Sequence, residues 1–117
     1  MQQIHITDDR KIADIQAEFN GHFPNLKIEF YSKEHHEGEG SAGEMIDASK
    51  TIGEVRTKHN EGDISINGHA KVSTLEEKFH DVFGLNVQVF RKSGDVWLQT
   101  TVTDEWTLSE QDHNARV

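Results

Sequence analysis

The chain has no cysteine, a single proline and no long apolar run. Without cysteine it forms no disulfide and has no thiolate to act as a metal ligand or nucleophile. No apolar stretch approaches the ~20 residues that a membrane-spanning helix requires. Met1-Gln2-Gln3 leads directly into a candidate strand, without the apolar segment of a secretory signal. These absences lead us to expect a cytoplasmic protein that does not bind membranes.

Apolar residues are also scarce, at 33% of the 117 residues. A single domain of this length buries roughly two-thirds of its unfolded surface, so we expect a small core surrounded by polar loops. Acidic residues outnumber basic ones by 21 to 12, which gives a formal net charge of -9. A charge of this sign disfavours non-specific binding to nucleic acids, although it is compatible with a local basic patch.

The apolar residues that are present follow the same pattern twice. In each half, a run of period two is followed by helical spacing and then by a second run of period two. Equivalent residues lie sixty positions apart from Ile4/Ile64 to Phe23/Phe83, and fifty-nine apart from Leu26/Leu85 onward. This repetition predicts two β-α-β units and indicates a duplication, or at least a shared architecture.

The pattern also predicts where the elements lie. Strands are expected at about 3–7, 25–32, 63–67, 85–92 and 95–103, and the two main helices at about 11–23 and 73–83. A short helix is expected at about 52–59, where Thr51 and Glu54 have the spacing of a capping box, and Ser73 and Glu76 have the same spacing.

These elements indicate an α+β fold, with two β-α-β units in a ferredoxin-like sandwich. It would have about five mainly antiparallel strands, with the helices on one face. We expect a single domain over 1–108, an acidic glycine-rich insert at about 34–47 and a flexible tail over 109–117. A different strand order remains open.

The strands of period two also assign side chains to the two faces of the predicted sheet. Tyr31 and Phe90 occupy equivalent positions and are both expected on the helix-free face. Pairing across the predicted hairpin brings Trp97 near Phe90. Arg91 is expected at the margin of this face, and the full candidate binding set is Tyr31, Phe90, Arg91 and Trp97. His5 and Ser65 would share the face.

Three interpretations of this face remain open. Trp106 and Leu108, or the long insert, could fold back over it, since aromatic residues are usually buried. Alternatively, the face could be an exposed patch for a protein partner or for a second copy of the chain. It could also stack the bases of single-stranded RNA, although the acidic net charge makes nucleic acid an unfavoured partner.

Eight histidines are many for this length, and the densest group is His35-His36-Glu37. Imidazole and carboxylate groups suit Zn²⁺ or a similar ion. These residues are therefore a candidate metal site, and the alternative interpretation is a solvated loop. Asp8 and Asp9 are interpreted as favourable charges at the start of the first main helix.

No set of nucleophile, base and oxyanion donors can be recognised from residue spacing, and no cofactor motif is present. We therefore expect a non-enzymatic interaction or regulatory module that uses the helix-free face. The partner would be another protein or a second copy. Metal binding and RNA binding are the alternatives.

Two runs of the chain resemble a small bacterial protein family to which no activity is assigned. The runs are VFRKSGDVWLQTT with TDEWTL, from Val89 to Leu108, and IGEVRTKHN, from Ile52 to Asn60. The resemblance implies a stand-alone intracellular bacterial protein, and it transfers no site residues.

Overall fold

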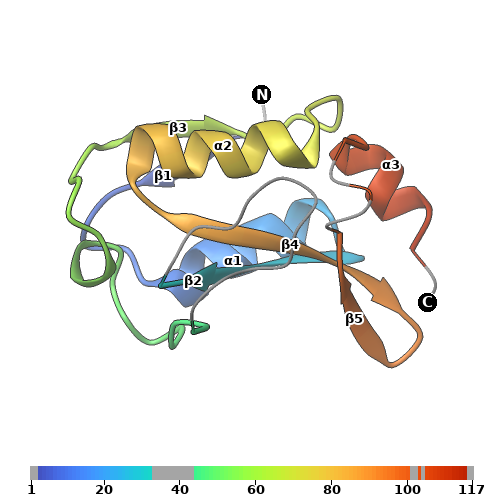
Figure 1. Cartoon of the computed structure of the whole chain (residues 1–117), viewed down its shortest axis with the longest axis horizontal. Coiled ribbons are helices and arrows are strands. Elements are labelled where there is room, and N and C mark those ends of the chain that lie inside the picture. The colour runs from blue at the N-terminus through green and yellow to red at the C-terminus, as the bar shows by residue number, and fades with distance from the viewer. Residues whose placement is uncertain (1–2, 33–43, 101–102, 104, 116–117) are drawn as a thin grey trace.

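The structure, a computed structural model, describes residues 3–32, 44–100, 103 and 105–115. Strands and helices alternate along most of the chain, as Figure 1 shows. The elements are β1 (Gln3–Ile6), α1 (Ile12–His22), β2 (Leu26–Tyr31), the short 3₁₀ helix η1 (Gly53–Val55), β3 (Gly62–Ser65), α2 (Val72–Phe83), β4 (Asn86–Ser93), β5 (Val96–Gln99) and α3 (Leu108–His113). The α+β class predicted from the sequence is confirmed.

The five strands form two antiparallel sheets. β1 pairs with β3 in one sheet, and the other has the order β2-β4-β5. A ferredoxin-like sandwich has both β-α-β units in one sheet, and among the described residues no ladder joins the two sheets. The predicted single sheet is therefore not found there. Hydrophobic periodicity assigns side chains to faces, but it does not choose the neighbour of a strand.

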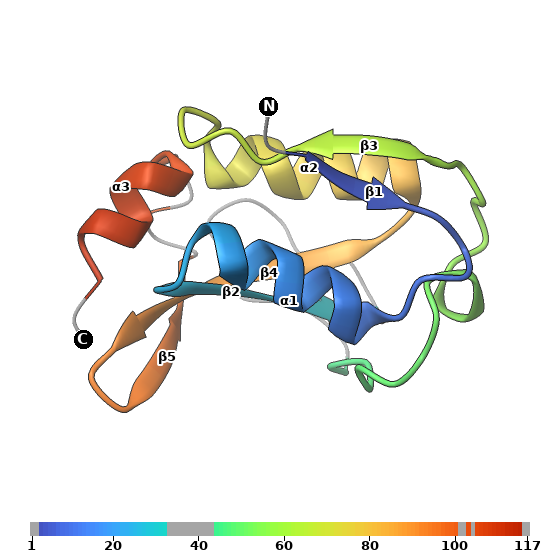
Figure 2. The same ribbon diagram turned by 180° about the vertical axis from the view of Figure 1, so that it is seen from behind.

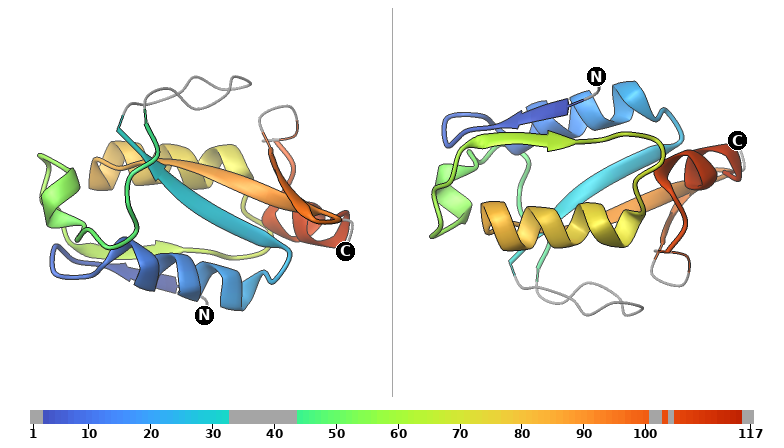
Figure 3. Two further views of the ribbon diagram at one scale, coloured as in Figure 1. Left: turned by 90° about the horizontal axis from the view of Figure 1, so that it is seen from below. Right: turned by 90° about the horizontal axis from the view of Figure 1, so that it is seen from above.

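The two sheets lie on opposite sides of one core, with α1 along one flank and α2 along the other (Figures 2 and 3). α1 packs against β2, and α2 packs against β4. Strands β1 to β4 and the three α-helices contribute apolar side chains to this core, whereas β5 contributes none. The buried side chains are Ile4, Ile6, Ile12, Ile15, Phe19, Phe23, Leu26, Ile28, Phe30, Ile52, Ile64, Ile66, Val72, Leu75, Phe79, Phe83, Leu85, Val87, Val89 and Leu108.

In the β1–β3 and β2–β4 ladders, one pair of facing residues is also equivalent in the sequence repeat. Ile4 faces Ile64 across the β1–β3 sheet, and Glu29 faces Gln88 across β2 and β4. The offsets are 64 − 4 = 60 and 88 − 29 = 59, the two values found in the sequence. An approximate two-fold relation between the halves would produce this pairing. The duplication itself stays a prediction.

Helix α2 begins differently from the prediction. Its N-cap is Lys71, whose side chain makes no capping bond, so Ser73 and Glu76 lie within the helix. Glu76 is 8% exposed, and its Oε2 accepts a hydrogen bond of 3.1 Å from the backbone N–H of Val89. Glu76 therefore joins α2 to β4, and the predicted capping box with Ser73 does not form.

The helix predicted at about 52–59 forms only its first turn, η1. One half of the expected capping box is present, because the Glu54 carboxylate accepts a hydrogen bond of 2.8 Å from the Thr51 N–H. Arg56, the C-cap residue, already has an extended backbone. The segment after η1 is therefore extended, and its side chains can reach another element.

The extended segment that follows η1 closes the C-terminal end of α2. The last carbonyl groups of a helix have no partner within the helix. Here three side chains donate hydrogen bonds to them, at 2.7 to 2.9 Å. The donors are Arg56, Lys58 and Asn60, and the respective acceptors are the carbonyl groups of Phe83, Asp81 and Val82. These bonds explain why the segment is extended here.

Residues 109–113 of the predicted tail belong to helix α3, and the domain boundary stays a prediction. α3 begins with a complete capping box between Thr107 and Glu110. Its Ser109 N–H donates to the carbonyl of Gly68 at 3.0 Å. A Cβ atom at Gly68 would lie 2.1 Å from the Ser109 Oγ, so a larger residue there would require the Ser109 side chain to rotate. α3 covers the end of the core beside α2 (Figure 1).

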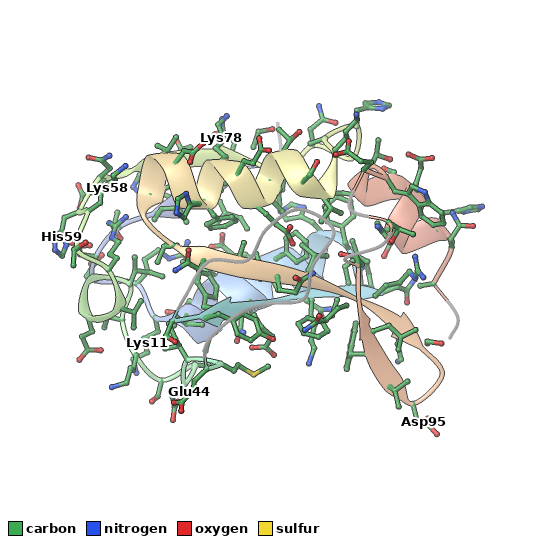
Figure 4. The ribbon with its side chains drawn as sticks, in the orientation of Figure 1. Lys11, Glu44, Lys58, His59, Lys78 and Asp95 are labelled. Carbon is green, nitrogen blue, oxygen red and sulfur yellow. The ribbon has the colours of Figure 1, made fainter. Side chains whose placement is uncertain are left out.

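Strands β4 and β5 form a hairpin that projects from the rest of the molecule (Figure 1). Gly94, at φ 62°, is the first residue of its two-residue turn, and Asp95 is the second. Glycine is favoured at a turn position that requires positive φ. The strand predicted over 95–103 ends at Gln99. The hairpin therefore has a short outer strand, and Asp95 lies at its tip (Figure 4).

Candidate functional site

The outer face of the β2–β4–β5 sheet points away from α1 and α2. The strand register places Tyr31, Phe90 and Trp97 on this face. Tyr31 and Phe90 are each only 8% exposed, so the sheet is not open at these two rings. Trp97 is half-buried and is the most accessible of the three. This face therefore presents one accessible ring instead of the expected row of three.

Other residues expected near this face lie elsewhere. His5 and Ser65 belong to the β1–β3 sheet, where the His5 Nδ1 lies 2.8 Å from Asp63 Oδ1. Leu108 is fully buried in the core, and Trp106 lies near Arg91. The face is therefore not covered by these C-terminal residues in the way that one interpretation of the sequence proposed.

Lys27 brings a positive charge to the accessible end of this face. Its Nζ lies 5.2 Å from the centroid of Phe90 and 5.3 Å from that of Trp97. An ammonium group at this distance is attracted to the negative face of an aromatic ring. The Lys27 Nζ also lies 3.3 Å from the Glu29 carboxylate, and Lys92 is the cross-strand neighbour of Trp97. Trp97 is thus flanked by two cations.

Arg91 lies on the opposite face, because its cross-strand neighbours are Leu26 and Leu98. Its Nη1 donates a hydrogen bond of 2.8 Å to the buried Gln111, and its guanidinium lies 5.5 Å from the Trp106 ring. Arg91 therefore joins β4 to α3. The sequence analysis expected Arg91 at the margin of the helix-free face, whereas the register places its side chain on the other face, because adjacent residues of a strand point in opposite directions.

The face of the hairpin that bears Arg91 also has exposed apolar side chains. Val96 is 55% exposed and Leu98 is 45% exposed, although both occupy the inward-facing positions of β5. Both side chains lie on the side of the sheet that faces the core. They are exposed because the hairpin extends past the end of the core. Trp106, near Arg91, is 37% exposed. Val96, Leu98 and Trp106 form the apolar part of the candidate site, and we call these three residues the hairpin surface.

A separate polar cluster joins the loop before α1 to the segment after η1. Asp8 Oδ1 accepts hydrogen bonds from Arg56 Nε at 3.0 Å and Nη2 at 2.7 Å. Asp8 Oδ2 lies 2.8 Å from the Nδ1 of His59. The Arg56 side chain is fully buried, whereas the His59 side chain is 52% exposed. His59 and Lys58 lie at the edge of the molecule in Figure 4.

This cluster holds an imidazole in a defined orientation. A carboxylate bound to the Nδ1 of a histidine directs its Nε2 outward, as in many catalytic and metal sites. In the described part of the chain, however, no three histidine or acidic side chains gather into a metal site. A shallow polar hollow of about 390 Å³ lies beside Arg56, lined also by Glu54 and Asn86. Its position at the end of α2 fits a structural role for Arg56.

Two of the three residues of this cluster lie close together in the sequence. Arg56 and His59 lie within the run from Ile52 to Asn60 that contributes to the family resemblance. Their partner Asp8 is 48 residues from Arg56 in the chain, and Asp8 was interpreted as a charge at a helix start. Local spacing does not indicate a contact of this range.

The cluster predicts a dependence of stability on pH. The hydrogen bonds from Arg56 hold the pKa of Asp8 below its usual value, and His59 lowers it further. A carboxyl group whose pKa is lower in the folded state stabilises the fold above its unfolded pKa, about 4, and loses this contribution as the pH falls through the lowered value. Urea unfolding should therefore show a difference between the wild type and Asp8→Asn at pH 6 that shrinks below about pH 4. A difference that is the same at all pH values would contradict this prediction.

The predicted metal ligands His35, His36 and Glu37 lie outside the residues that the structure describes, and their role stays a prediction. None of the helices in the described part of the chain is both long enough and apolar enough to cross a membrane. Comparisons with protein families, with curated proteins and with solved structures find no match for this chain. Its function is therefore argued from the geometry of the hairpin surface and of the polar cluster.

Proposed function

We propose that this protein is a non-enzymatic interaction module that contacts a protein partner through the hairpin surface. The observation that supports it most directly is the exposure of Val96 and Leu98 on a strand that projects beyond the core. Apolar side chains that gather on an exposed surface are typical of sites of protein association. Trp106 extends the apolar area toward α3.

The local charge of the hairpin also supports this surface. Residues 86–99 contain two basic residues, Arg91 and Lys92, and one acidic residue, Asp95, for a net charge of +1. The whole chain has a net charge of -9. The hairpin is thus a locally basic region of an acidic protein, which favours encounter with an acidic partner.

The polar cluster of Asp8, Arg56 and His59 supports a structural role better than a catalytic one. Arg56 directs its donors to Asp8 and to the end of α2, and its side chain is fully buried. A group that is wholly engaged inside the protein has no contact with a substrate. The cluster then serves to hold two distant segments together.

The proposal is tested by affinity capture from the native lysate, with bound proteins identified by mass spectrometry. Leu98→Lys places a charge in the hairpin surface and is expected to remove a partner that the wild type captures. Met45→Lys is the matched control, because Met45 is 52% exposed and pairs with Tyr31 at the far edge of β2. Equal capture of that partner by the wild type and by Leu98→Lys would contradict the proposal.

A further inference from the structure

Among the described residues, no strand pairs with the outer backbone edge of β5. Lys92 N–H donates to Asn25 on the β2 side, and the carbonyl of Val89 accepts from Thr100 on the β5 side. Successive residues of a strand direct their N–H and C=O groups to opposite edges. Arg91 and Ser93 therefore bond to their partners Leu98 and Val96.

The remaining residues of β5, Trp97 and Gln99, direct their backbone groups away from β4. Among the described residues β5 pairs with β4 alone. An edge of this kind is a template for the addition of another strand. Two N–H and two C=O groups are thus available to a segment that lies alongside β5.

The side chains beside this edge differ between the two faces. On one face Val96 and Leu98 are exposed, and Arg91, the cross-strand neighbour of Leu98, lies 5.5 Å from the Trp106 ring. On the other face Trp97 lies beneath the ammonium of Lys27, at 5.3 Å, and opposite Lys92. One face is therefore apolar, and the other combines an aromatic ring with positive charge.

From this arrangement we infer that β5 binds an extended segment of a partner protein in which apolar and acidic residues alternate. The inference deepens the proposed function and rests on it. In an antiparallel pair, residues that face each other lie on the same side of the sheet, with Cβ atoms ~5 Å apart. Side chains facing Val96 and Leu98 then meet apolar surface. Those facing Trp97 and Gln99 lie on the same face as Lys92 of β4 and Lys27 of β2.

The positive charges of Lys27 and Lys92 favour acidic residues in the partner segment. A carboxylate that faces Trp97 lies on the same face of the sheet as Lys92 of β4 and Lys27 of β2, so both lysines attract it across β5. The Glu29 carboxylate, 3.3 Å from the Lys27 Nζ, offsets part of the Lys27 charge, whereas Lys92 has no ion pair with a described residue. Lys92 would repel a basic residue at the same place. An extended segment of alternating valine and glutamate is the simplest ligand with the required chemistry.

The test is an NMR titration of the full chain with three peptides in which valine alternates with glutamate, glutamine or lysine. The glutamate peptide is expected to shift the amide signals of Trp97 and Gln99, and to bind about threefold to tenfold more tightly than the lysine peptide. Lys92→Gln is expected to reduce this preference.

Gln99→Pro is the decisive variant, because it removes an outward N–H and keeps the bonds of Leu98 to β4. Proline is tolerated on an edge strand when its missing N–H would face solvent. Leu98→Pro is the contrasting variant, because it breaks the pairing with β4. Retention of the hairpin signals in the Gln99→Pro spectrum verifies that the fold is intact. We expect this variant to lose peptide binding.

The possible results separate the inference from the proposed function. Peptide binding that survives Gln99→Pro would overturn strand addition, and equal affinity for the glutamate and lysine peptides would overturn the acidic preference. If no peptide binds but Leu98→Lys still removes a captured partner, strand addition fails and the proposed function stands. Salt-sensitive binding of an RNA oligonucleotide at Trp97 would contradict a protein ligand. Self-association abolished by Gln99→Pro would identify a second copy as the occupant and overturn the inference.

Discussion

Phe79→Ala is expected to lower the free energy of unfolding by about 3–5 kcal/mol, the range for removal of a buried phenylalanine. Phe79 is fully buried, and its ring meets that of Phe30 edge-on, with centroids 5.9 Å apart. This contact joins α2 to β2 across the core. The core of this chain is small, and β2 and α2 are both anchored on other sides. The cavity left by the ring is therefore not filled by local rearrangement.

Urea unfolding followed by circular dichroism measures this loss. The matched control is Val82→Ala on the same helix, where the side chain is 41% exposed and a change within about 0.5 kcal/mol is expected. Because a domain of this size is stabilised by only about 5–15 kcal/mol, the Phe79 variant should unfold at a clearly lower urea concentration. A loss below about 1 kcal/mol would show that the core tolerates the cavity.

Arg56→Ala is expected to have the second largest effect, a loss of about 3 kcal/mol. The buried Arg56 side chain donates to Asp8 twice and to the Phe83 carbonyl once. Hydrogen bonds of charged groups contribute about 1.5–3 kcal/mol, and a buried group left without its partner costs more than the bond itself. Removal of the guanidinium leaves the Phe83 carbonyl without a donor at the end of α2. The two segments that Arg56 connects are then held by fewer contacts.

The same unfolding measurement tests this prediction. Arg56→Lys keeps the charge but cannot reproduce the planar set of donors, so we expect it to lose most of the stabilisation. Lys58→Ala is the control, because Lys58 donates to the same helix end from an exposed position. The Arg56→Ala and Asp8→Ala changes should be strongly non-additive, since the two residues share hydrogen bonds. Additive effects would contradict the proposed coupling.

Most of the regular structure follows from local pattern. Ile12, Ile15 and Phe19 recur at helical spacing and are all buried in α1. The alternating residues of β2 and β4 likewise divide into buried and outward-facing sets. Such patterns are visible in the sequence because the period of a helix or strand is a property of the backbone alone.

Capping was less predictable, as the Thr/Ser-x-x-Glu sites at 51–54, 73–76 and 107–110 show. Only the site at 107–110, which the sequence analysis did not select, forms a complete capping box. At 73–76 the helix starts earlier, because the Val72 N–H bonds to the carbonyl of Trp106. A tertiary contact thus provides the partner that a capping side chain would otherwise supply.

The candidate site was predicted in part. Trp97 could be selected because the hairpin turn and strand alternation are local features. The exposure of Val96 and Leu98 could not, because their pattern is that of a buried strand. Burial depends on whether another element lies over the strand, and beyond the end of this core none of the described elements covers these two side chains.

The amino-acid sequence by itself determined the α+β class, the main helices and strands, and the division of strand residues between two faces. These follow from residue type and spacing within a few turns of backbone. The tertiary structure alone decided the pairing of β1 with β3 and of β2 with β4, the link from Asp8 to Arg56, and the position of β5 at the edge of the described sheet. Each depends on contacts between residues far apart in the chain, whose free energy exists only when the whole core has formed.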